Sequence, residues 1–305
     1  MTTKKICIPA RSRIICISDI HGELDMFKHL LTKVRFCNDD TLILLGDLYT
    51  KGINCHQTLK YCIQLAKKPN VHILRGNADW IADYLSAEEA AWLTALPEII
   101  DGGDYIFVHC GISENYIKNP AAETYAKYNN FANTAFPFKK WVVVGHWPVT
   151  MYYQNFPCHN PVINCEKKII SIDGGNVLNA DGQLNAFIIK DGHFSFEAVD
   201  ELPEYIVQKP QAESGGIIHI VWLDRFIEMV KEDKGLCNVK RLSTGETLTV
   251  PKSQVWEDEN GRLCCCNMAT DYHLPVNVGD VVGVVEEFED RMYVKRDGVS
   301  GWLVK

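Results

Sequence analysis

Six side chains that can bind metal ions follow short hydrophobic segments at five places in the sequence. The five motifs are SDIHG, LLGD, LRGN, FVHCG and VVGH. Imidazole, carboxylate and amide groups suit Mn, Fe or Zn better than a thiolate site would. Six such groups suffice for two divalent ions if one carboxylate bridges them. The candidate ligands are Asp19, His21, Asp47, Asn77, His109 and His146.

Buried strands must position these groups. Six hydrophobic runs are continuous rather than alternating, which is typical of strands covered on both faces of a sheet. They span residues 13–18, 41–46, 71–74, 105–111, 141–146 and 169–175. Ligands of α/β sheets bind at the carboxyl ends of the strands, so we expect the five motifs to meet at such an edge.

Helices and turns between these strands complete the predicted fold. Hydrophobic residues recur with helical spacing over 23–34 and again over about 59–66. Ser86 and the glutamate three residues later fit a capping box that begins a third helix. Asp191-Gly192 between two apolar segments predicts a β-hairpin. The pattern predicts an α/β fold with two packed sheets and helices outside.

In this order the five motifs resemble those of the calcineurin-like metallophosphoesterases, over about residues 13–190. Within this family the chain most resembles the branch that contains the phosphoprotein phosphatases and the bacterial diadenosine-tetraphosphate hydrolases. The segments GHWPV and SIDGG resemble those of the bacterial hydrolases in particular. The resemblance implies a two-sheet β-sandwich flanked by helices. It implies that Asp19 and His21 bind one metal ion and that Asp47 bridges both. The other ligands of the second ion would be Asn77, His109 and His146.

The resemblance also implies a reaction. Two divalent ions clamp a phosphate and lower the pKa of a shared water from about 15.7 towards 7. The resulting metal-bridging hydroxide would attack phosphorus in line and hydrolyse a phosphate ester or anhydride. Asp47 and Lys51 are the predicted catalytic residues, and Lys51 and Arg75 the predicted substrate-binding residues. Lys51 would meet phosphate as a point charge, where the family has arginine; a solvated loop lysine is the alternative.

The chain departs from the family pattern at a pair of positions. GDLYTKG (46–52) stands where the family has GDxxDRG, and Ala78 stands where it has histidine. In the phosphoprotein-phosphatase branch that histidine donates a proton to the leaving group, and an aspartate orients the histidine. Thr50 occupies the position of this aspartate. General acid catalysis is worth about 10²–10⁴-fold. We therefore expect weak activity on phosphoserine and better activity on phosphoanhydrides, aryl esters or activated diesters.

Other residues near the motifs leave alternatives open. A substitute proton donor could be His56, Asp79 or a metal-bound water, although His56 also fits an exposed residue near a helix start. Cys110 is interpreted as a small buried residue. Residues 112–140 are interpreted as a helical cap over the site, with Tyr and Phe side chains that stack on a base or ring of the substrate. The alternative is a surface helix whose aromatic side chains pack against one another.

The chain divides by composition into residues 1–200, a linker at 201–216 and a β-rich part at 217–305. The last part is predicted to contain one short helical stretch in LDRFIEMVK and a hairpin around Thr244-Gly245. Residues 278–305 resemble bacterial SH3-like domains and could bind a peptide or glycan partner. Three adjacent cysteines at 264–266 are interpreted as free thiols rather than as a zinc site.

Composition limits the partners. The net charge is −8, from 31 basic and 39 acidic residues, which disfavours bulk nucleic-acid binding. No segment has the length of a membrane span, and a signal peptide is not expected, so a cytoplasmic location with twelve reduced cysteines is predicted. The substrate would be a phosphorylated small molecule, a nucleotide or a phosphoprotein.

Two alternative functions remain open. One is a serine/threonine phosphatase-like enzyme with a substitute proton donor. The other is a catalytically weak metal-binding scaffold that recruits partners through the C-terminal part. A scaffold would have no need for all six ligand types, which favours the enzyme.

Overall fold

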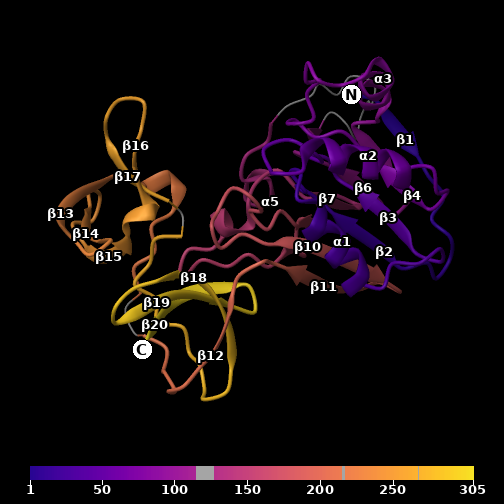
Figure 1. Ribbon diagram of the computed structural model, residues 1–305. Helices are drawn as coiled ribbons and strands as arrows, with labels where there is room; N and C mark the ends of the chain where they lie inside the picture. The colour runs from indigo at the N-terminus through magenta and orange to yellow at the C-terminus, as the bar shows by residue number, and fades with distance from the viewer. Residues whose placement is uncertain (115–126, 215–216, 267) are drawn as a thin grey trace. The chain divides into compact units, whose positions relative to one another are not determined.

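The structure is a computed structural model that describes residues 1–114, 127–214, 217–266 and 268–305. The chain forms two compact units (Figure 1). The first unit comprises Met1–Val149, Asn160–Leu178 and Gly182–Asp200. The second unit comprises Thr150–His159, Asn179–Asp181 and Glu201–Lys305. The predicted division into two linear domains joined by a linker stays a prediction.

Two sheets form the first unit, as the α/β prediction requires (Figure 1). The six-stranded sheet has the order β1 (Thr3–Lys5), β5 (Ile99–Asp101), β6 (Tyr105–Val108), β7 (Trp141–Val144), β9 (Ile169–Ser171) and β8 (Val162–Asn164). The five-stranded sheet has the order β11 (His193–Val199), β10 (Leu184–Lys190), β2 (Ile14–Ile17), β3 (Thr41–Leu44) and β4 (Val71–Ile73).

Strand β2 shows why these runs are apolar throughout. Successive side chains of a strand point to opposite faces of its sheet. Ile14 and Cys16 belong to a core shared with residues of the six-stranded sheet such as Phe107. Ile15 and Ile17 belong to a separate core that the helices complete. Both faces of β2 are therefore covered, and the predicted two-sheet sandwich with helices outside is confirmed.

Helices α1 (Leu24–Lys33), α2 (Cys55–Leu65) and α3 (Ala87–Ala95) lie between strands of the first unit. Phe27 of α1 and Leu59 of α2 are fully buried in the core of the five-stranded sheet. The expected capping box begins α3, where Ser86 and Glu89 exchange side-chain to backbone hydrogen bonds. Helices α1 and α2 connect parallel strands, so β2, β3 and β4 end at the same edge of their sheet.

The predicted hairpin around Asp191 and Gly192 is confirmed. Strands β10 and β11 pair antiparallel over their whole length up to Lys190 and His193. Asp191 has φ 51° and Gly192 has φ 76°. Positive φ at both central residues is the conformation that a tight two-residue hairpin turn requires, and Asp-Gly adopts it readily.

The described residues of the second unit include three small sheets, and its C-terminal part is β-rich as predicted. The four-stranded sheet has the order β12 (Glu204–Ile206), β18 (Val281–Glu287), β19 (Arg291–Arg296) and β20 (Val299–Val304). The other two sheets are β13 (Ile227–Asp233), β14 (Leu236–Arg241) and β15 (Thr247–Pro251), and β16 (Val255–Glu257) with β17 (Leu263–Cys265). The predicted hairpin around Thr244-Gly245 joins β14 to β15.

One detail of the predicted C-terminal half is wrong. The segment 223–231 is not helical beyond the short 3-10 turn Trp222–Asp224, because Ile227–Asp233 pairs antiparallel with β14. Ile227 is buried, Glu228 is exposed and Met229 is half-buried, which is the alternation of a strand. The predicted linker contains a strand, since Glu204–Ile206 pairs with β18.

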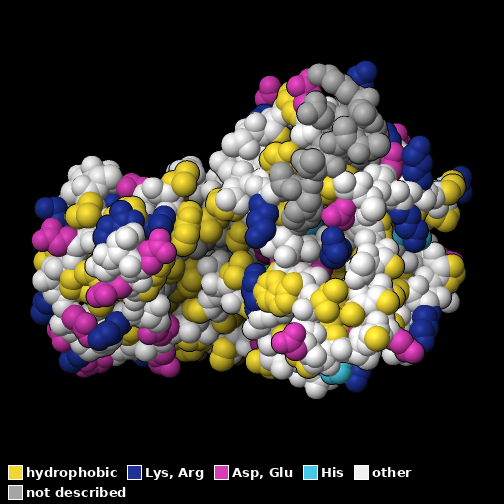
Figure 2. All heavy atoms as spheres, turned by 90° about the horizontal axis from the view of Figure 1, so that it is seen from above, with side chains coloured by type: hydrophobic (Ala, Val, Ile, Leu, Met, Phe, Trp, Pro, Cys, Tyr) yellow, Lys and Arg dark blue, Asp and Glu magenta, His cyan; other side chains and the backbone are white. Residues whose placement is uncertain are grey.

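Part of the predicted cap over residues 112–140 cannot be compared, because residues 115–126 lie outside the described part of the chain. The described part includes one helical turn, α5 (Phe131–Thr134), with Phe131 buried. Among the described residues, none of the helices has the length and apolar character needed to cross a bilayer. Figure 2 shows basic and acidic side chains interspersed on the face drawn.

Candidate metal centre

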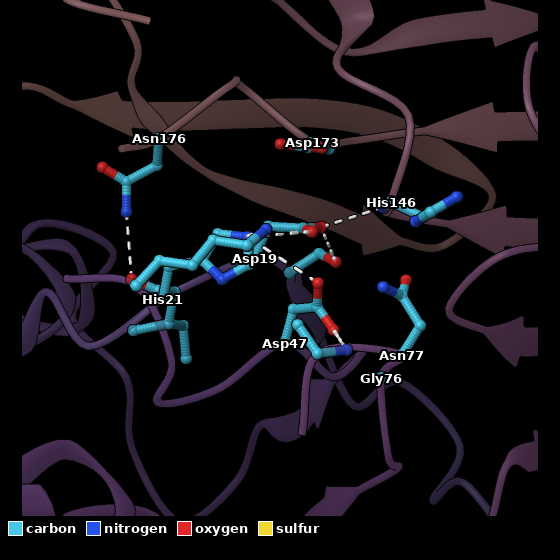
Figure 3. A network of polar contacts seen from close by, with 12 residues as sticks. Asp19, His21, Asp47, Gly76, Asn77, His146, Asp173 and Asn176 are labelled. Carbon is cyan, nitrogen blue, oxygen red and sulfur yellow. Dashed lines mark hydrogen bonds and ion pairs between the residues drawn. The ribbon is translucent and has the colours of Figure 1, made fainter. Parts of the chain in front are cut away.

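The structure brings the predicted metal ligands together at the carboxyl ends of five strands. Asp19 follows β2 and Asp47 follows β3 in the five-stranded sheet. Asn77 follows β4, while His109 and His146 follow β6 and β7 of the other sheet. Figure 3 shows labelled side chains from these separate loops converging on one region. His21, from the same loop as Asp19, completes the six.

Four of the six residues have a left-handed backbone, which non-glycine residues seldom adopt. The φ angles are 56° for Asp19, 50° for His21, 51° for Asp47 and 67° for His146. Such conformations cost free energy and are concentrated at functional sites. The turns after the strands therefore hold these residues in an uncommon backbone conformation, at some cost to stability.

The ligating atoms lie at spacings that a metal ion can bridge. His109 Nε2 lies 3.2 Å from Asp47 Oδ1 and 3.0 Å from Asn77 Oδ1. His21 Nε2 lies 3.8 Å from Asp19 Oδ1 and 3.7 Å from Asp47 Oδ2. One ligand atom each from Asp19, Asp47 and His109 lie within 4.8 Å of one another, and all three residues are buried.

Hydrogen bonds to neighbouring residues and within the cluster orient its members. His109 Nδ1 lies 2.8 Å from the Leu45 carbonyl oxygen, which fixes the proton on Nδ1 and directs the Nε2 lone pair into the site. The backbone N–H of His146 donates to Asp19 Oδ2 at 3.0 Å, and the Ser18 hydroxyl donates to the same oxygen. The ligands are therefore held in place by the protein itself.

Electrostatics at the cluster favour a cation. Burial lowers the pKa of His109, but the nearby Asp47 and Asp19 carboxylates outweigh burial and hold that pKa well above its usual value. Burial raises the pKa of Asp47, but His109 and His21 outweigh burial and keep it below its ordinary value. Burial and the charge of His109 lower the pKa of His146 to about 4. The carboxylates around His109 therefore favour a positive charge at this point of the cluster.

Two polar atoms at the site support metal binding further. His21 Nδ1 and Asp173 Oδ2 are buried and have no hydrogen-bond partner among the described residues. Burial and the Asp19 carboxylate raise the pKa of Asp173 well above its usual value. Three buried carboxyl groups beside imidazoles and an amide form a donor set that fits divalent cations of the Mn, Fe and Zn type.

Asp79 is a brace between loops rather than a group aimed at a leaving group. Its carboxylate accepts hydrogen bonds from the backbone N–H groups of Asp47 at 2.9 Å, Leu48 at 2.7 Å and Gly76 at 2.8 Å. Burial and the Asp47 charge raise its pKa to about 6. The N–H of Ala78 donates to Asp47 Oδ1 at 2.7 Å. The loop after β4 thus supports the carboxylate after β3.

Glycine is required where these two loops meet. A Cβ atom at Gly46 would lie 2.3 Å from the Gly76 nitrogen, and one at Gly76 would lie 2.2 Å from the Asp47 nitrogen. Any side chain at either position would force the loops apart. The glycines of the LLGD and LRGN motifs therefore permit the close backbone approach that places Asp47 and Asn77.

The remaining predicted residues, Lys51, Arg75 and His56, differ in the side chains that they contact. Lys51 Nζ is 3.1 Å from His21 Nε2. Arg75 Nη2 lies 3.3 Å from Glu98 Oε1. His56 Nε2 lies 2.8 Å from Glu89 Oε1. Lys51 is therefore beside the cluster, whereas Arg75 and His56 each contact a glutamate.

The positions of the family's acid pair are filled by small buried side chains. Ala78 is 1% exposed and Thr50 is 5% exposed. Thr50 Oγ1 has no hydrogen-bond partner among the described residues.

Sequence reasoning missed two residues of the loop after β9. Asp173 lies near Asp19 (Figure 3), and Asn176 Nδ2 donates to the Ile20 carbonyl oxygen at 3.0 Å. The signal that identified the other ligands could have found them. In SIDGGN, as in the five motifs, polar residues and glycines directly follow a hydrophobic run. The grouping of Cys110 with His109 and His146 was also missed, since cysteine beside a ligand has no sequence signature of its own.

Comparisons with known proteins place the chain in a family. Residues 12–194 match the calcineurin-like phosphoesterase family. The chain is 30% identical over 118 residues to a symmetrical bis(5'-nucleosyl)-tetraphosphatase of Neisseria gonorrhoeae, covering 32% of this chain and 42% of that protein. It is 32% identical over 127 residues to the enzyme of that name from Hamiltonella defensa, covering 34% and 46%.

These matches span less than half the length of the two relatives. A protein serine/threonine phosphatase from Saccharomyces cerevisiae is similar in structure, with a TM-score of 0.48 and 13% identity over 67% of this chain and 84% of that one. The family match covers more than half of the chain and includes all six predicted ligands. The chain belongs to the calcineurin-like phosphoesterase family.

Proposed function

We propose that the protein is a binuclear metal-dependent phosphoesterase that hydrolyses phosphate esters or anhydrides. The observation that carries the proposal is the convergence of candidate ligand atoms from five strand ends, with those of the buried residues Asp19, Asp47 and His109 within 4.8 Å of one another. Divalent ions of Mn, Fe or Zn bound there would supply Lewis acidity and offset the charge of a phosphate. The proposed ligands are Asp19, His21, Asp47, Asn77, His109 and His146.

The protein's own groups have distinct tasks in this proposal. Asp47 lies between the two sets of ligands, near His21 on one side and His109 on the other, and would contact both ions. The Lys51 ammonium group, next to His21, would bind a phosphate oxygen. Arg75 is a weaker candidate for substrate binding, because its guanidinium group contacts Glu98.

The leaving group is where this chain should differ from phosphoprotein phosphatases. Alanine at position 78 cannot donate a proton, and the two residues proposed as substitutes are engaged elsewhere. Asp79 accepts three backbone hydrogen bonds, and His56 contacts Glu89. A phosphate or phenolate leaves as a stable anion without a proton, whereas an alkoxide needs one. We therefore propose phosphoanhydrides or aryl esters as the preferred substrates.

Two exposed aromatic side chains follow Asp79 along the chain and suit an aromatic leaving group. Trp80 directly follows the brace residue Asp79, and both Trp80 and Tyr84 are 55% exposed. The related tetraphosphatases are named for bis(5'-nucleosyl) tetraphosphates. We propose a nucleotide with a phosphoanhydride bond as the first substrate class to assay.

A leaving-group series with Mn²⁺ tests this function. Rates on p-nitrophenyl phosphate, a dinucleoside tetraphosphate, a simple alkyl phosphate and a phosphoserine peptide should be compared at one pH. We expect the first two to exceed the last two by about 10²-fold or more in kcat/KM. Equal rates across the series would show that the missing acid has been replaced and would favour a protein-phosphatase-like enzyme.

Metal analysis distinguishes the proposed phosphoesterase from the alternative, a metal-binding scaffold. Purified protein that contains no Mn, Fe or Zn, and gains no activity when these are added, would favour the scaffold. A peptide or glycan partner for the C-terminal part, its SH3-like character and a cytoplasmic location stay predictions from the sequence.

A further inference from the structure

Cys110 lies among the predicted ligands of the second metal ion. It is 2% exposed, and its Sγ lies 3.5 Å from Asn77 Oδ1. That amide oxygen also lies 3.0 Å from His109 Nε2. Ligand atoms of His109, Cys110 and His146 lie within 4.8 Å of one another. A thiol, two imidazoles and an amide oxygen therefore face a common point.

The two measured distances among these atoms are close to those between ligand atoms of a tetrahedral metal site. With Zn–N distances of about 2.0 Å and Zn–S distances of about 2.3 Å, neighbouring ligand atoms lie about 3.3–3.8 Å apart. The 3.5 Å between Cys110 Sγ and Asn77 Oδ1 falls inside this range. The 3.0 Å between Asn77 Oδ1 and His109 Nε2 is slightly shorter and would widen by a few tenths of an ångström.

The local backbone explains how two adjacent residues reach the same site. Strand β6 ends at Val108, so the alternation of side chains stops before His109. Gly111 has φ 123°, and a Cβ atom there would lie 2.5 Å from the Phe131 ring. The turn after Cys110 therefore needs glycine and is packed against an aromatic side chain.

The surroundings of Cys110 differ from those of the other buried thiols in the first unit. Cys16 and Cys62 are fully buried in hydrophobic cores, where burial raises the pKa of each thiol above its usual value. Cys110 instead contacts the Asn77 amide and follows an imidazole whose Nε2 points into the site. A cysteine kept only for its size would not need these polar neighbours.

We infer that Cys110 is a further ligand of the metal ion bound by Asn77, His109 and His146, and that its thiolate favours zinc, iron or cobalt over manganese at that position. The inference rests on the metal centre of the proposed function. On binding, the thiol releases its proton to solvent and its sulfur forms the bond to the metal, with no change of oxidation state. Soft thiolate ligands select zinc and iron-type ions, whereas Mn²⁺ prefers oxygen ligands.

Cobalt spectroscopy of the full chain tests the inference without relying on activity. Metal-free protein is titrated with Co²⁺, and the thiolate-to-cobalt charge-transfer absorption in the near ultraviolet is measured. We expect the band in the wild type and in the matched control Cys16→Ala, which removes a thiol that is buried in a hydrophobic core. The band should be absent in Cys110→Ser, which keeps a residue of similar size.

A competition experiment provides the second readout. Zn²⁺ and Mn²⁺ compete for the protein, and bound metal is quantified after gel filtration. The wild type should prefer Zn²⁺, and Cys110→Ser should lose about tenfold or more of that preference. An unchanged Zn²⁺ to Mn²⁺ ratio in this variant would overturn the inference.

The outcomes separate this inference from the proposed function. Wild-type protein that binds Co²⁺ without a thiolate band overturns the role of Cys110 and leaves the metal centre intact. Wild-type protein that binds no Co²⁺ overturns both. Because the wild-type spectrum decides these cases, a poorly folded variant does not prevent the test.

Discussion

At the scale of single residues, Asp47 joins the two halves of the candidate centre. Its Oδ1 lies 3.2 Å from His109 and its Oδ2 lies 3.7 Å from His21. Asn at this position would keep the size and lose the charge that both ions need. We expect Asp47→Asn to lower kcat by at least about 10³-fold, equivalent to roughly 4 kcal/mol of transition-state stabilisation. Steady-state kinetics and metal analysis measure this, with the exposed Asp39→Asn as the control.

The effect of metal ions on thermal stability is a second measurement on Asp47→Asn. A ligand at 100 times its Kd stabilises the folded state by about 2.7 kcal/mol. Added Mn²⁺ should therefore raise the Tm of the wild type and of Asp39→Asn but leave Asp47→Asn almost unchanged. Full activity and a full Tm increase in Asp47→Asn would remove this residue from the metal centre.

His109 makes metal binding depend on pH. Its pKa is raised well above the usual value by Asp47 and Asp19, so the metal-free protein holds this proton at neutral pH. A metal ion must displace the proton, and apparent affinity should rise up to about tenfold per pH unit until the raised pKa is reached. Mn²⁺ titrations between pH 6 and 8 check this, with flat affinity as the contradicting result.

At the scale of elements, the loops after β3 and β4 are held together by Asp79. Its carboxylate accepts three backbone N–H groups that would otherwise be buried without a partner. Hydrogen bonds to a charged group contribute about 1.5–3 kcal/mol each, although not additively. We expect Asp79→Ala to lower the free energy of unfolding of the metal-free protein by about 3 kcal/mol. Urea denaturation measures it, and Asp83→Asn, an exposed aspartate four residues on, should change little.

The start of the five-stranded sheet contains an ion pair with a pH signature. Arg13 Nε and Nη2 donate to the two oxygens of Asp40, each at 2.8 Å. Burial raises the pKa of Asp40, but the bonds from Arg13 and the Cys37 N–H outweigh burial and leave it lowered. A lowered pKa means that the stabilisation exists above the unfolded value near 3.9 and is lost as pH falls through the folded value.

Asp40→Asn should therefore destabilise the protein by about 2 kcal/mol at pH 7, and the difference from the wild type should shrink below about pH 4. Denaturation curves across this range measure it. Asp101→Asn breaks the more exposed pair with Lys140 and should cost under about 1 kcal/mol. A gap between wild type and Asp40→Asn that stays constant down to acid pH would contradict the assignment.

At the scale of the whole molecule, the second unit includes two segments from the first 200 residues. His159 N–H donates to the Gly298 carbonyl at 2.8 Å, and Lys295 Nζ donates to the Asp181 carbonyl at 2.9 Å. His159 and Asp181 are themselves fully buried and lie 2.9 Å apart. Removing the C-terminal part would expose this ion pair together with residues 150–159.

A chain ending at residue 200 should therefore be less stable than the full chain and should be cut by proteases within 150–159. Thermal denaturation and limited proteolysis of the two chains check this. An equal Tm and no new cleavage site would show that residues 1–200 are self-sufficient.

The sequence by itself determined the sandwich and the six candidate ligands. Buried strands appear as continuous apolar runs, and polar residues with glycine mark where they end, so both signals are local. The turn at Asp191 is local for the same reason, because two residues set its backbone conformation.

Only the tertiary structure decided what depends on contacts between distant residues. Ile227–Asp233 is a strand because β14 pairs with it, although its local pattern also suits a helix. Asp79 and Cys110 lie in turns, where the strand alternation ends and the side-chain direction depends on what packs around the loop. For the same reason composition did not indicate that His159 and Asp181 belong with residues after 200, since long-range packing leaves no periodic trace in the sequence.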